Sequence, residues 1–359
     1  MSRMKTGGGS ATGANILISS AAFVIVVAGM REAQPLLVPF LLSVFIAIIV
    51  TPALSFLTDR RIPTMAAIVL IAMAIVAVGL LLGGLIGNSV DAFSAELPVY
   101  QEKLRTLTAS ISQWLSARGI VVSTQSVTAL LDPSRAMSMA AQGLTSLTGL
   151  LTNTLLILLT VVFLLFESSD IPAKLHLILK DPERSYRHFG RFLGTIKHYM
   201  LIKTATSILT GIMVSTMLWA LGVDFPMLWG VMAFFLNYVP NIGSLIAAIP
   251  AILLALVQLG VTSTLWVTAG YLVINNLVGN VIEPRFMGRE LGLSALVVFL
   301  SLVFWGWVLG TIGMFLSVPL TMTLKIALDS NDKTRWISIL LGPCPQEHPQ
   351  PMRSDGQTP

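Results

Sequence analysis

The chain has 359 residues, of which 55% are hydrophobic and 11% are charged. Soluble domains carry about 25% charged residues, so this composition excludes an ordinary soluble globular protein. The net charge is +5, but the basic residues are spread between apolar runs, which argues against nucleic acid as a partner. The single cysteine, Cys344, excludes a disulfide within one chain.

Eight apolar runs follow one another along the chain: 15–30, 35–57, 64–87, 144–166, 199–221, 227–259, 263–282 and 292–328. About 20 apolar residues cross the hydrocarbon as a helix. The sequence therefore predicts an all-α, polytopic membrane protein with about six full spans. A removed secretory signal is an alternative for the first run, but the next run begins at Pro35, which favours an uncleaved span.

Two polar inserts divide the chain into predicted regions: N-terminal helices in 1–87, an extracytoplasmic helical insert in 88–143, a transport core in 144–328 and a polar cytoplasmic tail in 329–359. The first insert is predicted to form amphipathic helices for packing or oligomer contacts, with solute capture as the alternative. Within the core, the basic segment 167–198 is predicted to lie amphipathically along the cytoplasmic interface, beside anionic lipid headgroups.

Sixteen of the 22 Lys and Arg residues fall on one side of the alternating runs. This bias predicts a bacterial-type inner membrane protein with both termini in the cytoplasm. The loop 222–226 then faces outward and Arg285 faces inward. Since 263–282 supplies one crossing between them, 227–259 must return to the face that it entered. The same argument makes 292–328 return, because basic residues of the cytoplasmic side flank it at both ends.

Helix breakers lie at the centre of both returning runs. Val239-Pro-Asn-Ile-Gly243 aligns with Leu309-Gly-Thr-Ile-Gly313, and a proline follows each, Pro250 and Pro319. The sequence therefore predicts two broken helical hairpins of opposite orientation, an inverted repeat. Such repeats are typical of secondary transporters, whose binding sites lie at the helix breaks. Close helix packing through small residues is the alternative explanation.

The predicted solute or ion site combines both tips with the helix 263–285. Its candidate residues are Asn237, Pro240, Asn241 and Gly243; Gly310, Thr311 and Gly313; and Asn276, Asn280 and Glu283. Asn276, Asn280 and Glu283 follow helical spacing, and amides can coordinate a cation or bind a polar solute. Glu283 is the preferred candidate for proton coupling, with neutralisation by Arg285 as the alternative. Predicted hinge or structural residues are Pro250, Pro284, Gly288 and Pro319, and Lys203 lies just inside a span.

The sequence contains no phosphate-binding loop, no His-Glu-x-x-His and no Gly-x-Ser-x-Gly motif. We therefore expect no enzymatic activity, catalytic residue, metal or cofactor, and transport without ATP hydrolysis. A passive channel and a non-transporting membrane scaffold that recruits partners are the alternatives.

The chain resembles the AI-2E (autoinducer-2 exporter) family of transporters over roughly 15–330. The resemblance rests on Val239–Gly243 with Pro250, on Gly279-Asn-Val-Ile-Glu-Pro-Arg285 with Gly288, and on Trp305-Gly-Trp-Val-Leu-Gly310 with Ile312-Gly313 and Pro319. It implies an oligomeric multi-span transporter. Some members are associated with autoinducer-2 export and others with exchange of sodium or lithium for protons. The expected partners are the lipid bilayer, a small solute or a monovalent cation and protons, and further copies of the chain.

Overall fold

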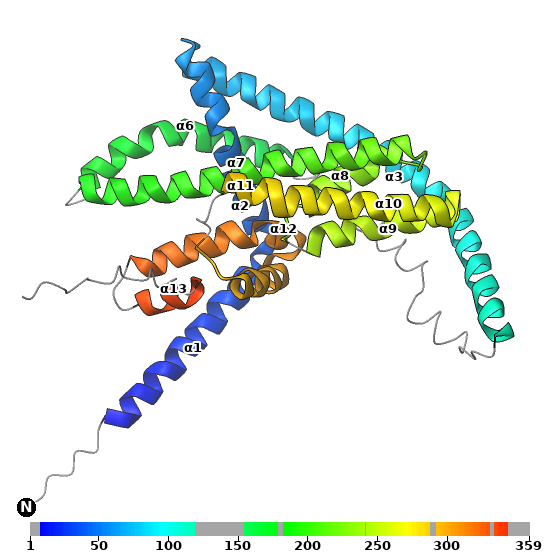
Figure 1. Cartoon of the computed structure of the whole chain (residues 1–359). Coiled ribbons are helices and arrows are strands. Elements are labelled where there is room, and N and C mark those ends of the chain that lie inside the picture. Colours follow the sequence, from blue (N-terminus) through cyan, green and yellow to red (C-terminus); the bar gives the residue numbers. More distant parts are fainter. Residues whose placement is uncertain are drawn as a thin grey trace, which may run out of the picture.

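A computed structural model describes residues 8–118, 154–178, 182–240, 242–287, 292–330 and 334–343. In these ranges the regular elements are helical, and no strand occurs among them: α1 (Gly8–Glu32), α2 (Gln34–Asp59), α3 (Thr64–Ala117), α6 (Thr154–Ile178), α7 (Pro182–Ala220), α8 (Pro226–Leu236), α9 (Ile242–Leu259), α10 (Val261–Asn275), the π-helix η1 (Asn276–Ile282), α11 (Glu283–Met287), α12 (Ala295–Asp329) and α13 (Arg335–Leu341) (Figure 1).

Six helical segments are long and apolar enough to cross a membrane: Gln34–Asp59, Thr64–Lys103, Leu193–Ala220, Ile242–Leu259, Val261–Phe286 and Ala295–Asp329. The apolar helices Thr154–Ser168 and Pro226–Leu236 are shorter, and α1 is not among the six. Large apolar side chains such as Leu80 and Trp266 are exposed on these helices, as a lipid-facing surface requires. The structure confirms an all-α, polytopic membrane protein.

The helices extend further than the apolar runs. α3 has 54 residues, about 80 Å at 1.5 Å per residue, and continues from the run 64–87 into the insert 88–143 without ending. Figure 1 shows this extension projecting beyond the other helices. The residues 119–143 lie outside the described part. α6 likewise runs past 166 to Ile178, and α7 begins at Pro182, so most of 167–198 belongs to the ends of two long helices.

The chain doubles back between α8 and α9. The backbone amide of Asp224 donates to Gln258 Oε1 at 2.9 Å, and Gln258 Nε2 donates to the carbonyl of Gly222 at 3.2 Å. The end of α9 is thereby tied to the start of α8. The helices α8 and α9, with α7 and α10 beside them, bury Trp229 and Leu254 completely. We call α8–α9 the first hairpin.

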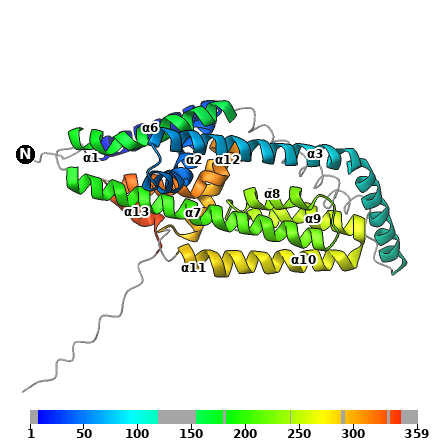
Figure 2. The ribbon, with the colours of Figure 1, turned by 90° about the horizontal axis from the view of Figure 1, so that it is seen from above.

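The helix α12 also doubles back, at Gly310, whose φ of 69° and ψ of −154° break the helix. Trp305 Nε1 donates to Thr321 Oγ1 at 2.9 Å across the break, and Lys325 Nζ donates to the carbonyl of Gly292 at the open end. The two halves of α12 therefore run antiparallel, as a second hairpin. Figure 2 shows α8 and α9 toward the end where α3 projects, and α13 toward the opposite end.

The two tips share one steric feature. A Cβ on Gly243 would lie 1.8 Å from the carbonyl oxygen of Leu236, and a Cβ on Gly313 would lie 2.0 Å from that of Trp305. Each would also meet the side chain four residues earlier, at positions that the sequence repeat aligns. Only glycine allows this approach of backbone to backbone. The matching spacing in the sequence therefore has the same physical cause in both hairpins.

Tyr100 joins the long α3 to the base of the first hairpin. Its hydroxyl contacts Glu96 on α3 and lies 3.0 Å from Asp224 Oδ2 before α8. Phe93, completely buried two turns earlier on that face, packs edge-on against Trp229 with ring centroids 5.4 Å apart. The hydroxyl has a single hydrogen, so it can donate to only one of the two carboxyl groups at a time.

We expect Tyr100→Phe to weaken the contact between α3 and the first hairpin by about 1–3 kcal/mol, because hydrogen bonds to charged groups are lost. Thermal unfolding of the purified protein in detergent measures the effect. The loss should be smaller when Tyr100→Phe is introduced into Asp224→Asn, since part of the interaction is then already absent. Equal losses in both backgrounds would show that the two residues do not interact.

Candidate functional site

A polar pocket lies at the tip of the first hairpin, between that tip, η1 and α7. Its volume is about 250 Å³. It is lined by Lys203, Asn237, Val239, Pro240, Ser244, Asn275, Asn276, Val278, Gly279, Asn280 and Glu283. Asn276 and Asn280 are exposed, so the pocket is open along η1, whereas Lys203 is buried at its inner wall.

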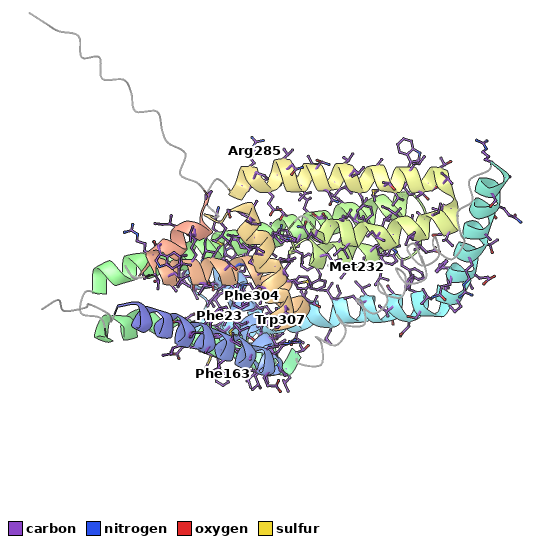
Figure 3. All side chains as sticks on the ribbon, turned by 90° about the horizontal axis from the view of Figure 1, so that it is seen from below. Phe23, Phe163, Met232, Arg285, Phe304 and Trp307 are labelled. Atoms are coloured by element: carbon purple, nitrogen blue, oxygen red, sulfur yellow. The ribbon has the colours of Figure 1, made fainter. Side chains whose placement is uncertain are left out.

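A buried ion pair forms that inner wall. Lys203 Nζ lies 2.7 Å from Glu283 Oε1, and the two side chains are 5% and 16% exposed. Arg285, the partner considered from the sequence, is exposed and projects away from the helices (Figure 3). In a membrane interior each of the paired charges would be costly alone, so the fold depends on both.

Lys203 belongs to a polar stripe on α7. Thr206, Ser207 and Thr210 follow it at helical spacing, and all four residues are at most 4% exposed. Thr206 donates to the carbonyl of Lys203 at 3.1 Å, and Thr210 to that of Thr206 at 2.9 Å. These bonds satisfy the hydroxyl hydrogens within the helix, so α7 can present a polar face inside an apolar bundle.

Ser207 of this stripe and the neighbouring Thr204 also hold the tip of the first hairpin. Asn237 Nδ2 donates to Ser207 Oγ at 3.0 Å, and the hydroxyl of Tyr238 donates to Thr204 Oγ1 at 2.8 Å. The amide nitrogen of Asn237 is therefore used by the protein. Its side-chain oxygen remains an acceptor for a bound molecule.

Two asparagines are linked along η1. Asn280 Nδ2 donates to Asn276 Oδ1 at 2.9 Å, and Asn276 Nδ2 donates to the carbonyl of Leu272 at 2.8 Å. The sequence predicted these residues on one regular α-helical face. The structure instead has a π-helix over Asn276–Ile282. This wider helical turn is rare in proteins, and where it does occur it is often at a functional site. Asn276 competes there with the backbone for a carbonyl, which favours a departure from α-helical bonding.

Five predicted site residues line this pocket: Asn237, Pro240, Asn276, Asn280 and Glu283. Gly243 lies beside it, where the tip approaches Leu236. Asn241 and Gly288 lie outside the described residues. Pro250 and Pro319 are buried within α9 and α12, and Pro284 is exposed at the start of α11. Sequence reasoning did not assign Lys203 or Ser244 to the site, and it noted Asn275 as a polar residue of the same span as Asn276 and Asn280 without including it among the site residues.

The second tip, with Gly310, Thr311 and Gly313, does not line the pocket. A Cβ on Gly310 would lie 3.0 Å from Gln34 Nε2, at the corner between α1 and α2. Just before that tip, Phe304 stacks on Phe23 of α1 with ring centroids 6.4 Å apart, and Figure 3 shows the two side by side. The structure therefore places this tip against the N-terminal helices, outside the lining of the pocket.

The two hairpins nevertheless contact each other. Tyr238, at the first tip, packs against one cluster that includes Ile312 and Leu316, just after the break in α12, and Leu293 and Met322 near the open end of the second hairpin. Phe235 of α8 stacks on Phe315 of α12 with ring centroids 6.5 Å apart. Phe235 lies two residues before the first tip and Phe315 two residues after Gly313, so this contact joins the regions of the two breaks. Within the described part of the chain, no group of three or more His, Cys, Asp and Glu residues could hold a metal ion.

The family and its relatives match most of the chain. The model of the AI-2E family transporters matches residues 19–332. The AI-2 transport protein TqsA of Escherichia coli is 41% identical over 329 residues, which cover 92% of this chain and 96% of that protein. A putative transport protein of Haemophilus influenzae is also 41% identical, over 91% of this chain and 95% of its own length. The putative transport protein YhhT of E. coli is 35% identical over 92% of this chain and 95% of its own length. These matches cover the hairpins and the polar pocket together, and the chain belongs to the AI-2E family of transporters.

Proposed function

We propose that this protein is a secondary transporter that exports a small polar solute and binds it in the pocket between the first hairpin tip, η1 and α7. The observation that carries the proposal is a polar pocket at a helix break within a bundle of apolar helices. Broken backbone is tolerated at membrane depth only against protein or a wet cavity, which is where transporters bind their cargo.

The cargo of the relative TqsA supports a solute of this kind, because that protein is named an AI-2 transport protein. Autoinducer-2 is the first solute to test. The proposed arrangement has both termini in the cytoplasm, hairpins that enter from opposite faces, and an assembly of several copies in the inner membrane. Transport requires the first tip and η1 to move so that the pocket opens to each side in turn.

Exchange of a monovalent cation for protons is the second candidate. The observation in its favour is that Glu283 and the side-chain oxygens of Asn237 and Asn280 offer hard oxygen ligands in one pocket. A passive channel and a scaffold without transport are the remaining alternatives.

The purified chain in liposomes should export autoinducer-2 at a rate that saturates with concentration. Loaded vesicles and a bioassay of the external solution measure this flux. Saturable flux without single-channel currents supports a carrier, whereas discrete currents would identify a channel. Failure to move autoinducer-2 or other small polar solutes under imposed proton, sodium or voltage gradients would contradict the proposed function.

Asn276→Ala should reduce solute flux about tenfold, because it removes two hydrogen bonds that order the open side of the pocket. The initial rate in liposomes at sub-saturating solute is the measurement. Asn88→Ala is the matched control, since Asn88 is exposed on α3 and does not line the pocket. If both changes reduce flux equally, the amide side chains of η1 are not part of the transport site.

Gly243→Ala should reduce flux by about tenfold or more, because its Cβ would displace the tip from the carbonyl of Leu236. Gly84→Ala is the control, since no atom lies within 4 Å of its added Cβ. Both variants should insert into the membrane. Unchanged flux in inserted Gly243→Ala would show that the close approach at the tip is not needed for transport.

A further inference from the structure

Among the residues that the structure describes, the pocket lining contains one positive and one negative side chain, and they neutralise each other. Lys203 Nζ is 2.7 Å from Glu283 Oε1, and the remaining described lining side chains are amides, one hydroxyl and apolar groups. This described lining is therefore polar but carries no net charge. An added cation would gain little from Glu283 while Lys203 remains bound to it, because the carboxylate is already compensated.

Without Lys203, the same pocket would resemble a site for a hard monovalent cation. Glu283 offers a carboxylate, and Asn237 and Asn280 offer amide oxygens whose nitrogens are bonded elsewhere. Carboxylate and carbonyl oxygens are the ligands that hard cations prefer. The ammonium of Lys203 lies against Glu283, the one carboxylate among the described lining residues, where such a cation would be most stable.

We propose that Lys203 is a built-in cation that closes this site to Na⁺ and Li⁺ and restricts it to solutes without net charge. Lys203 is tethered to α7, so its ammonium is present at Glu283 at a high effective concentration and free cations must compete with it. The polar stripe on α7 fixes that helix face toward the pocket, so the ammonium does not need to be positioned by the solute. This inference rests on the proposed function for the identity of the site, and it selects solute export over cation exchange.

Binding of ²²Na⁺ to the purified full-length protein tests the proposal without requiring transport. The unaltered chain should show no saturable binding, whereas Lys203→Gln should bind Na⁺ at least about tenfold more tightly than the unaltered chain. Adding Glu283→Gln to Lys203→Gln should abolish that binding. Lys203→Arg, which keeps the charge, should behave like the unaltered chain. Lys197→Gln is the control for the loss of one charge from α7, since Lys197 does not line the pocket, and it should not create binding.

A folded Lys203→Gln variant, judged by gel filtration and thermal unfolding, that binds no Na⁺ would overturn the proposal. If this variant does not fold, the test uses the unaltered chain. Its thermal stability and any solute flux should then be the same in sodium, lithium and choline chloride. Saturable Na⁺ binding by the unaltered chain, or flux that requires sodium, would also overturn it. If Lys203→Gln binds Na⁺ but the unaltered chain exports no solute, the result supports the role of Lys203 as a built-in cation. It then contradicts only the proposed transport function.

Discussion

A helix that ends inside hydrocarbon leaves backbone groups without partners, and each costs several kcal/mol unless other groups replace the lost bonds. The first hairpin meets this constraint within its own turn, where the backbone amides of Tyr238, Val239 and Gly243 donate to the carbonyls of Phe235, Leu236 and Val239. On α7, Thr204 accepts from the Tyr238 hydroxyl and Ser207 accepts from Asn237, so side chains of one helix hold the place where another helix stops. The same helix presents Lys203 to Glu283. The helix that holds the side chains at the end of α8 is thus the helix that forms the inner wall of the pocket, which explains why the break and the polar site coincide.

The features that could be predicted from the sequence are those with a local cause. Pro240 and Gly243 break a helix wherever they occur, and the spacing of Asn276, Asn280 and Glu283 places them together on any helical surface. The partner of Glu283 has no such local signal. Arg285 is two residues away but points outward, whereas Lys203 is 80 residues earlier and reaches Glu283 only because α7 packs against η1 and α11. The sequence did contain a signal for Lys203. Four polar residues, Lys203, Thr206, Ser207 and Thr210, stand at positions i, i+3, i+4 and i+7 of the apolar run 199–221, and this spacing indicates a buried polar face on that helix.

The two hairpins are similar in length but their tips differ in their neighbours. The outgoing arm of each hairpin, α9 or the part of α12 after Gly310, has about 18 to 19 residues, roughly 27–28 Å, which is close to the hydrocarbon thickness of about 30 Å. Phe235, just before the first break, stacks on Phe315, just after the second, while Gly310 itself lies beside Gln34. The comparison of the two tip sequences predicted their shared steric design. It did not predict that the pocket forms at the first tip alone, because a local sequence repeat does not tell which helices each tip meets.

The charge balance of the pocket also bears on how a carrier returns after releasing its cargo. A site with one uncompensated charge would move that charge through the membrane potential, at about 2.3 kcal/mol per charge per 100 mV, and would expose it to a low dielectric. With Lys203 on Glu283, the empty site is neutral and its charged groups are already desolvated together. Under the proposed function, the empty carrier therefore needs no ion to complete its cycle. The ion pair then has one physical role in both halves of that cycle: it keeps the number of charges in the pocket the same whether or not a neutral solute is bound.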